Sequence, residues 1–135
     1  MVSQGFSEID HTGDLALRVW GKDFQDLLRQ AARGFYHLLN VNTIDGSRVS
    51  ESFSIDLVER EAMLVDFLNE LLYLCEERQE IFHRFSFNNN GHQLIVKAQG
   101  EKAALIVRHI KAVTFHDLNI IDHRDRLETI VTFDV

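Results

Sequence analysis

The sequence has no proline, a single cysteine and no long apolar run. Because no proline-rich or glycine-rich stretch marks a linker, we expect residues 1–135 to form one domain, long enough to bury a substantial core. The lone Cys75 excludes an internal disulfide and a metal site made of thiolates alone, which fits a reducing compartment. No stretch reaches the roughly 18 apolar residues that span a bilayer, and the first ten residues do not read as a signal peptide. We therefore expect a cytoplasmic protein without a membrane segment.

Positive charge is scarce as well. The chain has 14 Lys and Arg residues against 21 Asp and Glu residues, which gives a net charge of −7 and a pI near 5.4. Binding to a nucleic-acid backbone depends on clustered Lys and Arg residues that release counterions, so this balance predicts no direct nucleic-acid partner. It fits partners that are cations or basic protein surfaces.

Several motifs of catalysis and cofactor binding are missing. The seven histidines are scattered, without the close His/Glu or His/Cys spacing of zinc sites. Ser50, Ser52 and Ser54 alternate along one segment, but no G-x-S-x-G nucleophile turn surrounds them. The glycine patterns of phosphate-binding loops and dinucleotide-binding folds are also missing. The sequence therefore gives no support to a zinc enzyme, a serine hydrolase or a nucleotide-binding fold.

Two periodicities divide the chain into helices and strands. Apolar residues at helical spacing predict helices over 24–40 and 61–77. Alternating apolar and polar residues predict strands over 14–20, 52–58, 81–87, 94–98, 110–120 and 126–133. Helices separated by strand pairs are typical of the α+β class. We expect a single-domain sandwich in which the two main helices pack on a mixed, largely antiparallel sheet.

The segment 111–116 (KAVTFH) places an ammonium, a hydroxyl and an imidazole inside a predicted strand. Burying such groups without partners costs roughly 1–3 kcal/mol each, so their presence indicates a site. Alternation puts Lys111 and His116 on opposite faces of a regular strand, which argues against a simple catalytic pair. The alternative is a Lys111 whose stem lies along apolar surface and a His116 exposed at a strand end.

Two further segments carry oxygen ligands. His11-Thr12-Gly13-Asp14 precedes a predicted strand, and Asp134 stands next to the last residue, Val135. The Asp134 carboxylate with the carbonyl and terminal carboxylate of Val135 offers hard oxygens of the kind that Ca²⁺ and Mg²⁺ prefer. The alternatives are an ordinary turn at 11–14 and a solvated Asp134.

Three blocks in this order resemble the archease family. They are the H-T-x-D block at 11–14, the D-F-L-N-E-L-L-Y block at 66–73 and the K-A-V-T-F-H block at 111–116. The resemblance extends over nearly the whole chain, including the Phe133-Asp134-Val135 ending.

The resemblance implies a metal-binding protein cofactor of an RtcB-type RNA ligase, not an enzyme in its own right. Such a cofactor promotes GTP-dependent guanylylation of the ligase and its repeated turnover in tRNA splicing or RNA repair. The metal ligands implied are Asp14, Asp134 and the backbone or terminal oxygen of Val135. The residues implied in activating the partner are Lys111, with His116 and His11 in less certain roles. The expected cation is Ca²⁺, with Mg²⁺ or Mn²⁺ as alternatives, because oxygen ligands serve all three.

The sequence departs from the family pattern at two positions. Gly13 replaces the usual Ala before the Asp, which widens the conformational range of the backbone there. Phe115 replaces the usual Tyr and removes a hydroxyl. Two other functions remain open from the residues alone: a stand-alone metal-dependent enzyme acting on nucleotides or phosphoesters, and a chaperone-like interaction module.

Overall fold

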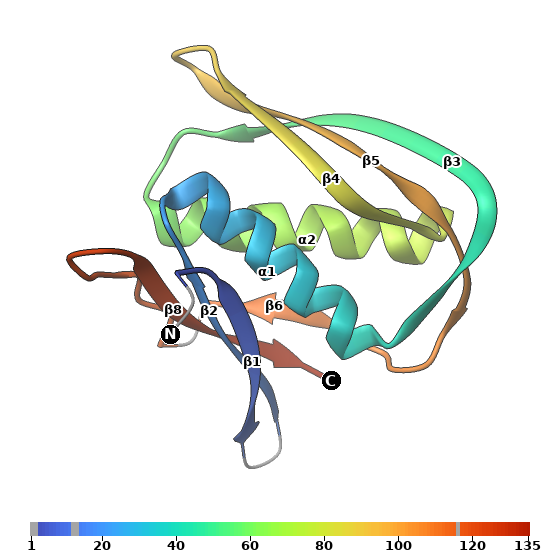
Figure 1. The fold of residues 1–135 in the computed structure, drawn as a ribbon, viewed down its shortest axis with the longest axis horizontal. Coiled ribbons are helices and arrows are strands. Elements are labelled where there is room, and N and C mark those ends of the chain that lie inside the picture. Colours follow the sequence, from blue (N-terminus) through green and yellow to red (C-terminus); the bar gives the residue numbers. More distant parts are fainter. Residues whose placement is uncertain (1–2, 12–13, 116) are drawn as a thin grey trace.

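The computed structural model describes residues 3–11, 14–115 and 117–135, which form two helices and eight strands (Figure 1). In chain order these are β1 (Gly5–His11), β2 (Asp14–Gly21), α1 (Phe24–Leu39), β3 (Val41–Asp56), α2 (Arg60–Arg78), β4 (Glu80–Asn89), β5 (Gln93–Ile106), β6 (Ala112–Thr114), β7 (Ile121–Asp122) and β8 (Leu127–Asp134).

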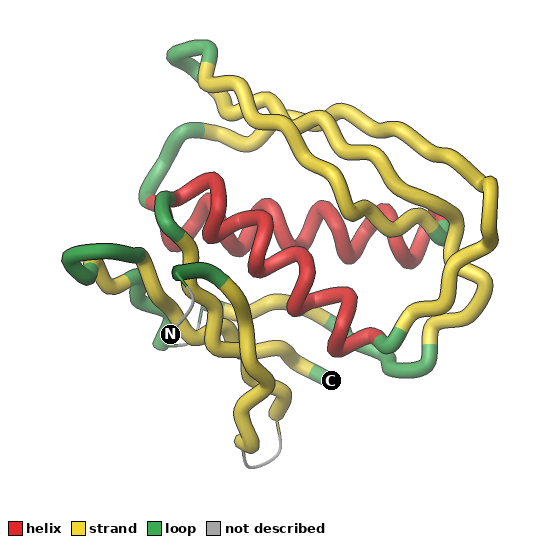
Figure 2. The backbone as a smooth tube through the Cα atoms, viewed as in Figure 1, coloured by secondary structure: helices red, strands yellow, loops and turns green. Residues whose placement is uncertain are grey.

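The strands form two separate sheets with both helices between them (Figure 2). One sheet has the order β1-β2-β8-β6, with β7 also paired to β8, and the other has the order β3-β5-β4. Every strand pairing in the described residues is antiparallel. The predicted α+β class with two helices on antiparallel strands is confirmed, and the strands divide into two sheets where the sequence suggested one mixed sheet.

The position of the helices explains their composition. Helix α1 lies across β1 and β2 and also touches β4, while α2 packs against β3, β4 and β6. A helix covered on two sides must be apolar over a broad part of its surface. The nine buried residues of α2 meet this need; they are Met63, Leu64, Val65, Phe67, Leu68, Leu71, Leu72, Leu74 and Cys75. Within the described residues, neither helix is long and apolar enough to cross a membrane.

Local signals set the ends of α1. The Asp23 side chain accepts a hydrogen bond from the backbone N–H of Asp26 at 2.8 Å, which satisfies one free donor of the first turn. Asn40 ends the helix in the left-handed conformation, with φ of 52°. Both predicted helices are confirmed to within about two residues at each end.

The predicted strand boundaries differ most in two places. Strand β3 begins at Val41 and not at Ser52, because the Asp45-Gly46 turn signal lies in an irregular stretch of the strand between Thr43 and Arg48. Strand β6 has three residues, where alternation predicted a strand over 110–120. Strands β1 and β7 were not predicted.

Candidate metal-binding corner at the strand ends

Three strand ends meet at one edge of the first sheet. Leu15 of β2 lies across from Phe133 of β8, so Asp14 lies across from Asp134 one position beyond this pair. On the other side of β8, Ala112 of β6 pairs with Asp134. The backbone N–H of Lys111 donates to the carbonyl oxygen of Asp134 at 2.7 Å. Segments separated by about a hundred residues are thus joined, and we call Asp14, Asp134, Val135 and Lys111 the strand-end corner.

The alternation of the strands decides where the two carboxylates point. Phe133 is fully buried and Leu15 is half-buried against the core, so their neighbours Asp134 and Asp14 take the opposite face. Residues directly across from each other on antiparallel strands share a face. Asp14 and Asp134 are therefore exposed on the same face of the sheet, away from the helices. Two carboxylates in this position repel each other unless a cation or a donor lies between them.

The chemistry of this donor set fits a hard divalent cation. Two carboxylates and the backbone oxygen of Val135 are the ligand types of Ca²⁺ and Mg²⁺, which bind oxygen. Among the residues that the structure describes, no group of three or more His, Cys, Asp or Glu side chains is placed to hold a metal ion. A cation at the corner would therefore have few protein ligands, and water or a partner would complete its coordination.

The structure describes the other residues implied in activation to different extents. Lys111 is exposed and directly precedes the short strand β6, where its backbone N–H bonds to the carbonyl oxygen of Asp134. His11 ends β1 across from Asp14. Its side chain, like Thr12, Gly13 and His116, lies outside the described residues.

Two residues of α2 hold the segment that follows Lys111. The side-chain oxygen of Asn69 accepts from the backbone N–H of Val113 at 3.2 Å, and Glu61 accepts from the N–H of Ile120 at 3.0 Å. The first bond takes the place of strand pairing on the free edge of β6, and the second attaches the chain beyond β6 to the start of α2. Asn69 was assigned no role from the sequence, although it lies in the block at 66–73 that carries part of the family resemblance.

The groups with shifted pKa values lie away from the strand-end corner. Burial raises the pKa of the Cys75 thiol to about 11, so this cysteine is a packing residue and a poor nucleophile. Burial, followed by a hydrogen bond with Glu51, raises the pKa of Glu80. That same hydrogen bond is the main cause that lowers the pKa of Glu51. Neither group belongs to the strand-end corner.

Comparison with known proteins decides the family. The archease protein family model matches residues 6–135. The chain belongs to the archease family. The archease of Methanosarcina barkeri is 32% identical over 147 aligned residues that cover all of both chains. The archease-like protein of Dictyostelium discoideum is 24% identical and covers 98% of this chain and 94% of its own.

Solved structures agree with the archease fold. A crystal structure of an archease from Thermotoga maritima, described as a possible chaperone, superposes with a TM-score of 0.73 at 24% identity and covers 96% of both chains. The solution structure of a Methanobacterium thermoautotrophicum protein gives a TM-score of 0.74 at 20% identity, with 97% of this chain and 99% of the other covered. At these identities the likeness shows the fold. The predicted family is confirmed.

Proposed function

We propose that this archease is a metal-binding protein cofactor of an RtcB-type RNA ligase. In this role it promotes GTP-dependent guanylylation of the ligase and its repeated turnover in tRNA splicing or RNA repair, and it does not catalyse a reaction itself. The observation that carries the proposal is the meeting of Asp14, Asp134 and Lys111 at one sheet edge, together with the family membership.

Each residue of the strand-end corner has a role that follows from its place. Asp14, Asp134 and the backbone oxygen of Val135 would hold the cation, for which Ca²⁺ is the first candidate. When bound, the cation supplies positive charge that stabilises phosphate oxygens. The exposed Lys111 would add a second positive charge beside Asp134. All four residues belong to strand ends, so the corner can enter a concave site on a partner.

The test is a guanylylation assay with purified ligase, GTP and this protein, using the variants Asp14→Asn and Asp134→Asn. We expect each variant to lower the activation by about tenfold or more, since even groups that only orient metal ligands typically contribute that much. Asp45→Asn removes an equal charge from an exposed position in β3 and is the matched control. Full activation by both corner variants would refute the site, and no activation by the unmodified protein would refute the function.

Metal binding is tested without the ligase. A ligand at a hundred times its dissociation constant stabilises a protein by about 2.7 kcal/mol, which raises the melting temperature of a domain of this size by on the order of 10 °C. We expect saturating Ca²⁺ to give such a shift, EDTA to reverse it, and Asp134→Asn to abolish it. An unchanged melting temperature with Ca²⁺, Mg²⁺ and Mn²⁺ would contradict the metal site.

A second candidate is a chaperone-like module, since the related Thermotoga maritima protein is described as a possible chaperone. The two functions predict different results in one experiment. A chaperone raises the yield of folded ligase during refolding and has no effect on ligase that is already folded. A guanylylation cofactor accelerates the reaction of folded ligase.

A further inference from the structure

The second sheet has one face that neither helix covers. Along β5, the buried Leu94, Val96 and Ala98 point toward the helices, so Lys97 and Gln99 point away from them. The cross-strand register places polar residues of β3 and β4 directly across from these residues of β5, and we call each such set of facing residues a row. Ser52, Lys97 and Ser86 form one row, Ser50, Gln99 and Arg84 form the next, and Arg48 lies across from Glu101 in the third. We call these eight residues the outer face.

The outer face is basic although the chain is acidic. Arg48, Arg84 and Lys97 are exposed, and within the described residues none of them forms an ion pair. Six other basic residues do pair with carboxylates; they are Arg18, Arg60, Arg78, Lys102, Arg108 and Arg126. Glu101 is the acidic member of the outer face, and its carboxylate is 3.4 Å from His83. Asp56, farther along β3, accepts a hydrogen bond from Gln93 at 3.0 Å.

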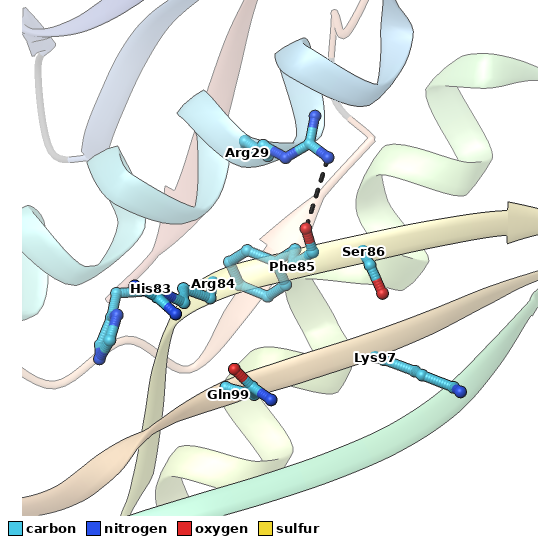
Figure 3. Close-up of a pocket in the computed structure, with 7 residues that line it drawn as sticks. All are labelled: Arg29, His83, Arg84, Phe85, Ser86, Lys97 and Gln99. Atoms are coloured by element: carbon cyan, nitrogen blue, oxygen red, sulfur yellow. Dashed lines mark hydrogen bonds between the residues drawn. The ribbon is translucent and has the colours of Figure 1, made fainter.

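The surface is hollowed where these charges lie. Two adjoining depressions of about 500 Å³ and 430 Å³ share His83, Arg84 and Gln99. Figure 3 shows Arg29 reaching from α1 to the free edge of β4 at the first depression. Its guanidinium donates to the Phe85 carbonyl at 3.4 Å and lies 5.0 Å from the centre of the Phe87 ring. A fourth cation is therefore fixed at the rim, and it has no carboxylate partner among the described residues.

The residue types of the outer face indicate which kind of ligand it can bind. Successive rows are about 7 Å apart along the strands, so the three cations form an extended strip and not a single pocket. Serine hydroxyls and an amide lie between the cations, where they suit phosphate oxygens and ribose hydroxyls. None of the eight residues of the outer face is aromatic or apolar; the neighbouring apolar side chains are Phe85, which lines the first depression, and Ile95, one row farther along β5. The face therefore offers charged and polar groups in the main and no broad apolar centre of the kind that protein interfaces bury. We propose that the outer face binds the sugar–phosphate backbone of a double-stranded RNA stem.

The net charge of −7 predicted no nucleic-acid partner, and the distribution of charge changes that expectation. At physiological salt the field of a charge decays over about 8 Å, so a phosphate on the outer face senses mainly the local cations. Four cations predict binding that weakens steeply with salt, by roughly a hundredfold between about 50 mM and 200 mM. The binding is expected to be independent of sequence, because only the backbone is contacted.

The test is fluorescence anisotropy of a labelled RNA hairpin with the isolated protein, so the result does not depend on any ligase. The variant Arg84→Gln/Lys97→Gln removes two cations from the outer face. It should weaken binding about tenfold or more and lower the slope of affinity against salt by about two. Lys22→Gln/Arg124→Gln removes the same charge from exposed positions elsewhere and should change affinity less than about twofold.

Three results would overturn the inference. They are no binding of the hairpin at about 50 mM salt, an equal loss in the two double variants, and equally tight binding of a DNA duplex or an acidic peptide with the same sensitivity to Arg84→Gln/Lys97→Gln. All four substituted residues are exposed and unpaired within the described part of the chain, so both variants should keep the melting temperature of the unmodified protein.

Discussion

Gly34 offers a sharp test of how α1 is seated on the first sheet. Glycine inside a helix is normally a weakness, and replacing it with alanine gains about 1 kcal/mol at a site with free space. Gly34 has no such space. A Cβ atom added there would be 2.2 Å from Cδ2 of Leu17 and 3.1 Å from Cγ of Phe6. Gly34 therefore allows the close approach of α1 to β2 and β1.

The sign of the Gly34→Ala effect follows from the space available to Leu17. Carbon atoms in contact lie about 3.5–4.0 Å apart, so the Leu17 methyl must move by more than about 1 Å. Leu17 is fully buried and has no open side into which to move. Adding a methyl group to a packed core costs about 1–3 kcal/mol, and this site belongs at the upper end of that range. After the gain in helix propensity, we expect a net loss of about 1–2 kcal/mol in the free energy of unfolding.

A double-mutant cycle with Leu17→Ala separates the gain in helix propensity from the cost of the close contact with Leu17. Urea unfolding should show that Gly34→Ala destabilises the unmodified protein. The same substitution should stabilise the Leu17→Ala background by about 0.5–1 kcal/mol, because the methyl group that blocks the site is gone. The coupling energy should be about 2 kcal/mol. If Gly34→Ala stabilised the unmodified protein, or if the two effects were additive, the close contact between α1 and β2 would be refuted.

Three further predictions concern the core and its titrating groups. Phe67 lies 5.4–6.2 Å, between ring centroids, from Phe53, Phe85 and Phe87, so Phe67→Ala should lower the free energy of unfolding by about 3–5 kcal/mol in urea titrations, and Phe67→Leu by clearly less. The raised pKa of Glu80 means that the stabilisation by its protonated carboxyl is complete below the pKa of the unfolded chain and is lost as pH rises through the raised pKa. Glu80→Gln, which cannot ionise, should therefore flatten the fall of the melting temperature over that pH window, and an unchanged profile would contradict the shift. Because burial raises the pKa of Cys75 to about 11, the folded protein should react with a thiol reagent near pH 8 at least about tenfold more slowly than the urea-unfolded chain, and equal rates would show that the thiol is accessible.

Periodicity predicted those helices and strands that are determined by signals within their own residues. Helix α1 has the Asp23 cap and an apolar stripe, and β2 has a regular alternation from Leu15 to Val19, so both were located from local signals. Strand β6 was not, because it depends on the hydrogen bond that the Val113 N–H donates to Asn69 and on pairing with β8. Such contacts join residues far apart in the chain and leave no periodic trace in the sequence.

Local sequence patterns could not predict the division into two sheets, for the same reason. Alternation identifies a strand and its buried face, but it does not name the partner strand. In this protein β8 pairs with β2 and β6, and β5 pairs with β3 and β4, which places the two helices between the sheets. The nine buried residues of α2 form the broad apolar surface that a helix covered on two sides needs.

The strand-end corner was reached through resemblance, and the register of the first sheet explains why the resemblance points to these positions. Leu17 pairs with Val131, and both are fully buried, so the core fixes which residues of β2 and β8 face inward. A slip of one residue would bury Asp14 and Asp134 and expose the apolar set, at a cost of many kcal/mol. The packing that stabilises the sheet therefore also holds the two carboxylates across from each other. Substitutions at Leu17 or Val131 should consequently weaken metal binding together with stability, whereas Asp14→Asn should affect metal binding alone.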